Sequence, residues 1–300
     1  MVLCSNENYI LKQRGKKDMM KFKIVADSCC ELEDKFKSLE NIELIPLTLT
    51  VSGEDIVDDE TFDQNAFIQK VKKATEEPKS SCPSPSLYME AYEGDYDYIF
   101  VVTLSANLSG SYNSAEVGRT MYYEEHPEDK KQIYIFDSCS ASVGETLMVL
   151  KIMELAQNDC TYEEIVEKVL AFRKGRSTYF VIESLETLRK NGRLTGMTAM
   201  VASVLNIKPI MYGTEEGMLA KLDQARGMEK ALAKLAAHIV ETAKDSEKRI
   251  LAISHVNNRQ RAESVKEEIL KGRQFKDVII LDTAGVSSMY ACDGGIIISY

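Results

Sequence analysis

The stretch Tyr98-Ile-Phe-Val-Val-Thr-Leu104 is followed directly by Ser105-Ala-Asn-Leu-Ser-Gly-Ser111. A continuous apolar run of this length is typical of a strand that is buried on both faces. The small hydroxyl residues after it begin a predicted helix over 109–124. A second buried strand over 133–136 and a helix over 143–157 repeat the pattern. Strands separated by helices of this length predict a parallel sheet with helices on both faces.

The same alternation extends toward the N-terminus. Residues 22–26 form a short apolar β run, and residues 42–51 are rich in β-forming residues. Asp27-Ser28 offers N-cap chemistry for a helix over 30–37. Residues 21–175 are therefore predicted to form an N-terminal, doubly wound α/β domain with a mostly parallel sheet.

The second half of the chain alternates less regularly. Residues 207–212 and 218–225 resemble a hairpin across the turn 213–217, and residues 226–245 have the spacing of a long amphipathic helix. A hairpin requires mixed strand directions, so residues 176–300 are predicted to form a C-terminal α/β domain with a mixed sheet. Residues 1–20 carry four basic residues and no strand or helix pattern, and we expect an N-terminal extension outside the fold.

Composition excludes several classes of protein. The chain has 300 residues, with 37 Lys and Arg against 47 Asp and Glu, so its formal net charge is −10. Nucleic acid and anionic membrane surfaces both require a basic face, which argues against them as main partners. Seven cysteines without a CxxC motif predict neither a disulfide framework nor a zinc site. The expected compartment is therefore the reducing cytoplasm.

Hydroxyl residues gather in three clusters, at 80–85, 105–111 and 137–142. The second and third clusters follow buried strands and precede helices, which is where open α/β sheets bind ligands. Backbone N–H groups at a helix start favour an anion, and serine hydroxyls add neutral donors. A single serine in a turn is usually only an N-cap. Three clusters together favour a ligand that carries an oxyanion.

Standard catalytic motifs are missing. Neither GxxxxGK[ST] nor GxGxxG occurs, so the sequence predicts no nucleotide cofactor, and three dispersed histidines predict no metal centre. One enzymatic alternative stays open, a serine-dependent acyl hydrolase with Ser109 as nucleophile. It would require His255 as the base and an acid such as Asp282. The sequence around Ser109 lacks the first glycine of GxSxG.

The hydroxyl clusters also carry a family resemblance. Asp27-Ser28, Ser80-Ser-Cys-Pro-Ser-Pro85, Leu108-Ser-Gly-Ser-Tyr-Asn-Ser-Ala115 and Leu185-Glu-Thr-Leu-Arg-Lys-Asn-Gly-Arg193 occur in the order seen in the DegV family. The chain resembles that family over residues 21–300. The resemblance implies a non-catalytic, two-domain protein that binds a long-chain fatty acid such as palmitate. Some members are the acyl-carrying subunit of a fatty acid kinase and present the carboxylate to a separate ATP-dependent subunit.

The resemblance also implies which residues bind the carboxylate. Ser80 and Ser81 match the start of the family's Thr-Ser-x-Pro-Ser motif, and Ser109 matches its Leu-Ser-Gly-Thr motif. The family's third ligand is a histidine near the C-terminus, and Tyr290 stands at that position here. A phenol can donate a hydrogen bond to a carboxylate but carries no positive charge near pH 7. The replacement of this histidine by tyrosine is expected to affect coupling to the kinase more than it affects lipid binding.

A fatty acid needs a long apolar slot with a few donors at one end, and each buried methylene contributes about 0.8 kcal/mol. The sequence offers neutral hydroxyls for that end rather than a dedicated arginine clamp. Residues 197–204 and the C-terminal strands are candidates to line the slot, although core packing explains each of them as well. Arg189, Lys190 and Arg193 form either a solvated basic turn or a docking edge for the kinase or a phosphate.

Overall fold

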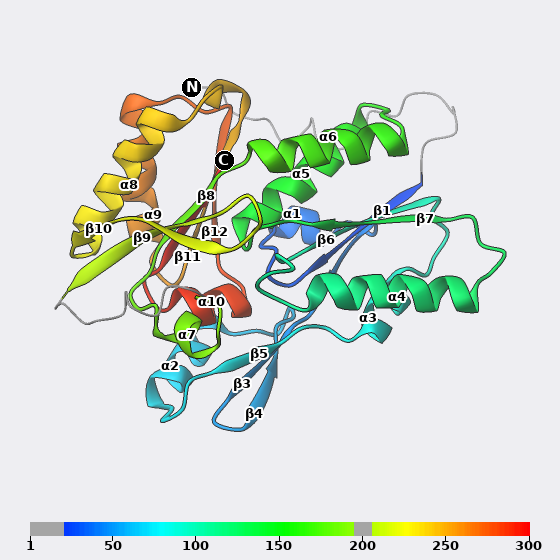
Figure 1. Cartoon of the computed structure of the whole chain (residues 1–300), viewed down its shortest axis with the longest axis horizontal. Helices are drawn as coiled ribbons and strands as arrows, with labels where there is room; N and C mark the ends of the chain where they lie inside the picture. The colour runs from blue at the N-terminus through cyan, green and yellow to red at the C-terminus, as the bar shows by residue number, and fades with distance from the viewer. Residues whose placement is uncertain (1–20, 195–205) are drawn as a thin grey trace.

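A four-stranded parallel sheet organises the N-terminal half (Figure 1). The computed structural model describes residues 21–194 and 206–300. The sheet has the order β2-β1-β6-β7, and every neighbouring pair is parallel. Its strands are β1 (Phe22–Asp27), β2 (Ile42–Ile45), β6 (Tyr98–Thr103) and β7 (Gln132–Asp137). The apolar run at 98–104 is thus the central strand that its composition predicts.

Helices cover both faces of this sheet, as Figure 1 shows. On one face lie α3 (Pro85–Ala91) and α4 (Ser111–Glu125), whose buried tyrosines Tyr88 and Tyr122 pack with Ile99 and Val101. On the other face lie α5 (Val143–Gln157) and α6 (Tyr162–Gly175). These layers make the N-terminal part a doubly wound α/β structure, as the sequence predicts.

The C-terminal half contains a six-stranded mixed sheet with the order β10-β9-β8-β13-β11-β12. Only β11 and β12 run parallel; every other neighbouring pair is antiparallel. The predicted hairpin is present, formed by β9 and β10. The strands are β8 (Thr178–Val181), β9 (Ile207–Gly213), β10 (Leu219–Arg226), β11 (Ile250–His255), β12 (Asp277–Asp282) and β13 (Ile296–Ser299).

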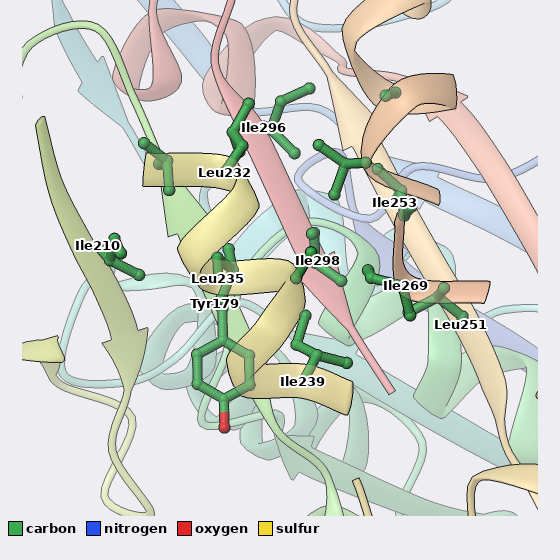
Figure 2. Close-up of a cluster of buried hydrophobic side chains, with 14 of the residues drawn as sticks. Tyr179, Ile210, Leu232, Leu235, Ile239, Leu251, Ile253, Ile269, Ile296 and Ile298 are labelled. Atoms are coloured by element: carbon green, nitrogen blue, oxygen red, sulfur yellow. The ribbon is translucent and has the colours of Figure 1, made fainter. Parts of the chain in front are cut away.

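Two long helices, α8 (Met228–Thr242) and α9 (Arg259–Gly272), cover one face of the mixed sheet. Figure 2 shows the resulting core, in which Leu235 and Ile239 of α8 lie against Tyr179 and Ile298 of the sheet. The short helices α7 (Glu186–Lys190) and α10 (Gly285–Ala291) share a separate apolar cluster with β8 and β9.

Helix α5 joins the two sheets. Its residues Met148 and Ile152 belong to the core of the parallel sheet, whereas Val143 and Leu147 pack with Ala252 of β11 and with Leu281 of β12. A helix that is apolar on both sides must be buried on both sides. The two halves of the chain therefore share one continuous apolar contact through this helix.

The β-rich residues 42–51 form two strands, because Pro46 interrupts the run after β2 and has no N–H for a ladder. A third, antiparallel sheet follows, with the order β4-β3-β5. The strands of this third sheet are β3 (Thr48–Val51), β4 (Glu54–Val57) and β5 (Lys79–Ser81). Helix α2 (Gln64–Lys73) lies between β4 and β5 in the chain. One predicted helix is shorter than expected. The helix expected over 30–37 is reduced to α1 (Asp34–Lys37).

None of the helices in residues 21–194 and 206–300 is both long enough and apolar enough to cross a membrane. The extension expected at 1–20 lies outside the described residues.

Candidate functional site

An apolar pocket lies between the two large sheets. Its wall comes from β8, β10, β13, α7 and α10 and from the loops that follow β6 and β7. Most of the lining side chains are apolar: Leu104, Leu108, Ala141, Phe180, Ile182, Leu188, Leu219, Val286, Ala291 and Ile297. Residues 197–204, expected to contribute, lie outside the described residues. A pocket with this lining suits an apolar ligand.

Tyr290, on the wall of this pocket, lies next to Ser80. The Tyr290 hydroxyl on α10 lies 3.0 Å from the Ser80 hydroxyl on β5, and Tyr290 itself lines the pocket. Successive residues of a strand point to opposite faces, so the neighbouring Ser81 is solvent-exposed and turned away. The structure therefore brings Ser80 and Tyr290 together and leaves Ser81 apart from them.

Asp58 fixes the position of α10 and hence of Tyr290. Its carboxylate accepts hydrogen bonds from the backbone N–H groups of Gly285 (2.6 Å) and Val286 (3.0 Å) at the start of the helix. It also accepts one from the Ser28 hydroxyl at 2.9 Å. Burial raises the pKa of Asp58, and these three hydrogen bonds oppose that rise.

Ser109 lies just before α4, in the loop that follows β6. Its Oγ accepts a hydrogen bond from the Ser111 backbone N–H at 3.2 Å and lies 3.1 Å from the Ser111 hydroxyl. This loop passes close to β5, because a β-carbon placed on Gly110 would lie 2.8 Å from the Cys82 sulfur. The next residue toward the sheet, Leu108, lines the pocket. Ser109 thus follows a lining residue directly in the chain, but it is not itself a residue of the pocket wall.

Arg193, which the sequence places in a basic turn or a docking edge, lines the pocket. Its guanidinium carbon lies 5.9 Å from the centre of the Tyr290 ring, and its Nε donates to the Leu108 carbonyl at 3.1 Å. The other two cations of the predicted basic turn are engaged elsewhere, Arg189 with Glu186 and Lys190 with Glu77. Arg193 therefore adds a positive charge beside Tyr290, where the sequence predicts only neutral hydroxyl donors.

The tip of the β9–β10 hairpin closes one side of the pocket. The Ser105 hydroxyl donates to the Gly217 carbonyl at 2.7 Å, and the Asn107 side-chain amide donates to the Glu216 carbonyl at 2.7 Å. Gly217 has a φ of +78°, and a β-carbon there would lie 2.8 Å from the Cys139 Cα. Only glycine permits this turn and this close approach.

Three buried carboxyl groups lie behind the serine loops, on Asp27, Glu31 and Glu145. Asp27 does not cap a helix as predicted; its carboxylate accepts the backbone N–H groups of Leu104 (2.8 Å) and Cys29 (3.2 Å). Glu31 accepts the Ser142 hydroxyl at 2.6 Å. Burial raises the pKa of Asp27 to about 6 and that of Glu31 to about 7. Within the described residues, no group of histidine, cysteine and acidic side chains has a geometry that could hold a metal ion.

The hydrolase alternative finds no support in the geometry. His255 does lie 3.5 Å from Asp282, but its Nδ1 accepts the Asn258 backbone N–H, and burial lowers its pKa. The Ser109 hydroxyl is paired with Ser111 instead. His126 pairs with Glu93, and His238 lies against Tyr179. No histidine therefore serves Ser109 as a base.

Comparison with known proteins agrees with this arrangement. Residues 21–300 match a family model described as "Uncharacterised protein, DegV family". A DegV domain-containing protein of Streptococcus pneumoniae is 33% identical over 283 residues, covering 94% of this chain and 99% of the relative. A DegV family protein from Ruminococcus gnavus, solved with vaccenic acid, is 44% identical, with a TM-score of 0.90 over 94% of this chain and 100% of its own. The Streptococcus pneumoniae Fatty Acid Kinase (Fak) B3 protein, loaded with linoleic acid, is 33% identical. Its TM-score is 0.84, and the match covers 94% of this chain and 99% of that protein. A match that spans both large sheets means that this chain belongs to the DegV family.

Proposed function

We propose that the chain binds a long-chain fatty acid, with the tail in the pocket and the carboxylate held by Ser80, Ser109 and Tyr290. The observation that carries the proposal is an apolar pocket lined by Tyr290, whose hydroxyl lies 3.0 Å from the Ser80 hydroxyl. Ser81, which the family resemblance also implies, is left out of this set because it pairs with Thr48 in the β ladder and its side chain is solvent-exposed.

The chemistry of the tail and of the carboxylate of a fatty acid supports this assignment. About 14 methylenes of palmitate, buried at about 0.8 kcal/mol each, contribute on the order of 11 kcal/mol before the costs of binding. Hydroxyl donors satisfy a carboxylate that would otherwise be costly to desolvate. Arg193 stacks near the Tyr290 ring and supplies the positive charge that a tyrosine lacks.

The ligands of similar structures point the same way, since one holds vaccenic acid and another holds linoleic acid. The likeness to the Fak B3 protein supports a role as the non-catalytic subunit that presents the carboxylate to a separate ATP-dependent kinase. We place the division between the lipid-binding halves after residue 175. The six described cysteines are free thiols, which supports a cytoplasmic location.

Native mass spectrometry of the protein purified from cells tests the proposal, followed by extraction and identification of any bound lipid. We expect one long-chain fatty acid per chain, because the protein has one apolar pocket of this kind among the described residues. Adding ATP to the loaded chain alone should yield no acyl phosphate. Protein that carries no lipid and binds none on titration with palmitate would contradict fatty-acid binding.

A further inference from the structure

Ser140 and Thr178 place a pair of hydroxyl groups in the mainly apolar wall of the pocket. Ser140 belongs to the third hydroxyl cluster, at 137–142, which the proposed carboxylate site does not use. Its hydroxyl lies 3.0 Å from the Thr178 hydroxyl, so the pair joins the loop after β7 to the first residue of β8. A slot that holds only hydrocarbon gains nothing from such a pair, because polar atoms are costly to bury unless they are hydrogen-bonded.

The strand register shows that the Thr178 side chain lies on the pocket face of the mixed sheet. Residues at every second position of a strand share a face, and Thr178, Phe180 and Ile182 all line the pocket. The neighbouring strand β13 has the same pattern, since Ile297 pairs with Phe180 and also lines the pocket. Ser299 pairs with Thr178, two residues after Ile297, and therefore lies on this face too.

The pair is remote from the proposed carboxylate site. Figure 1 shows α7 and α10, which carries Tyr290, at one end of the mixed sheet and the C-terminus at the other end. Ser177, which directly precedes Thr178, pairs through its backbone with the C-terminal residue Tyr300. Thr178 and Ile182 are also separated by about 13 Å of extended chain. The hydroxyl pair therefore meets the tail of a bound fatty acid rather than its carboxylate.

The hydroxyls form a chain of hydrogen bonds with a fixed direction. The Ser299 hydroxyl donates to the Ser177 carbonyl at 2.9 Å, and a carbonyl can only accept. Ser299 also lies 2.9 Å from the Thr178 hydroxyl, and because its single proton is already used, Thr178 is the donor in that contact. The proton of Thr178 is then used as well, so Ser140 donates to Thr178. All three hydrogen bonds form together only in this order.

The Ser140 oxygen is therefore left with an unfilled acceptor position. A hydroxyl oxygen has two lone pairs, and no donor from residues 21–194 or 206–300 bonds to this one. Ser140 is only 4% exposed, so bulk water has little access to it. Gly144 covers the hydroxyl from the side of α5, because a β-carbon there would lie 2.1 Å from Ser140 Oγ. A plain hydrocarbon tail would bury this acceptor without pairing it, which is unfavourable.

We propose that Ser140 is a specificity-determining residue and that the pocket prefers a fatty acid with a hydroxyl group on its tail. The inference rests on the proposed function and names the class of fatty acid. The ligand hydroxyl donates to the Ser140 oxygen, because the Ser140 proton is engaged with Thr178. A carbon–carbon double bond has no proton to donate and cannot take this place. The hydroxyl belongs in the half of the tail away from the carboxylate, because the pair is remote from Tyr290.

Isothermal titration calorimetry compares palmitate with a series of hydroxypalmitates, each with one hydroxyl in the half of the chain away from the carboxyl group. In a purely apolar pocket the buried, unpaired hydroxyl would weaken binding about tenfold or more. We expect at least one isomer to bind the wild type as tightly as palmitate or more tightly. Ser140→Ala should weaken that isomer roughly threefold to tenfold relative to palmitate. Ser264→Ala, at an exposed position of α9, should leave the ratio of the two affinities unchanged.

The wild-type series decides even if Ser140→Ala fails to fold. Weaker binding than palmitate for every isomer would overturn the proposal. An equal change for palmitate and for the best isomer in Ser140→Ala would overturn it as well, because Ser140 would then only support the pocket. In both cases the proposed function survives, since palmitate still binds. If neither palmitate nor any hydroxypalmitate binds to the wild type, the proposed function itself fails.

Discussion

Replacing Ser109 by alanine removes one hydroxyl donor from the proposed carboxylate site and leaves the apolar wall unchanged. A hydrogen bond to a charged group contributes about 1.5–3 kcal/mol, so palmitate affinity should fall roughly tenfold to hundredfold. The tail keeps its burial, worth on the order of 11 kcal/mol before costs, and binding should therefore survive. Folding stability should fall by about 1 kcal/mol, because the Ser111 N–H loses its acceptor in the loop.

Calorimetric titration with palmitate and with the alcohol of equal length separates the two ends of the ligand. The alcohol should lose much less affinity than the acid, since it presents no charge to Ser109. Ser264→Ala is the matched control, because that hydroxyl is exposed on α9 and bonds only to the Gln260 carbonyl within the described residues. Unchanged palmitate affinity, or an equal loss for acid and alcohol, would refute the assignment of Ser109 as a carboxylate ligand.

Further changes test the pocket, the turn and the buried acids. Leu219→Trp should fill the pocket and lower the affinity for palmitate more than tenfold, with little change in melting temperature. Palmitate titration and thermal melts measure both. Unchanged palmitate affinity would contradict the pocket assignment. Gly217→Ala should lower the free energy of unfolding by about 1–3 kcal/mol, because the residue has a positive φ and approaches Cys139 closely. Urea denaturation of the variant and the wild type measures this loss, and an unchanged midpoint would refute the prediction. Glu31 has a folded pKa of about 7, above its unfolded value, so its ionisation should remove stability as the pH rises from about 4.5 to 7. Urea denaturation across that range should show the free energy of unfolding falling by on the order of 3 kcal/mol because of this group. The Glu31→Gln variant should lose this fall. An equal dependence of unfolding free energy on pH in the variant would show that Glu31 is not responsible.

Much of the fold could be predicted because local patterns and tertiary environment agree. The apolar strand at 98–104 and the helix at 143–157 are buried on both sides, and their composition says so directly. The β-forming residues of 42–51 do not reveal that the stretch divides between two sheets, because β propensity does not show which sheet a strand joins. Pro46 was the available signal for that division.

The site could be predicted only in part. Motif resemblance predicts Ser80, Ser81, Ser109 and Tyr290 as carboxylate ligands, and the structure places Ser80 and Tyr290 within hydrogen-bonding distance of each other. Whether a polar side chain is buried depends on elements far away in the sequence, so Glu145 looked like an ordinary residue in the first turn of a helix. Arg193 was assigned to a surface turn for the same reason, because its approach to Tyr290 spans almost one hundred residues.

The contact between the β9–β10 tip and the loop after β6 has a consequence for how fast a ligand exchanges. Helix α5 holds the two sheets together through many buried side chains, whereas the tip is fastened by the two side-chain hydrogen bonds of Ser105 and Asn107. Breaking two such bonds costs about 2 kcal/mol, far less than separating the sheets. The tip should therefore detach many times before the molecule unfolds, and its detachment would set the dissociation rate of the lipid. Removing the Asn107 amide should speed lipid release and leave the unfolding rate unchanged.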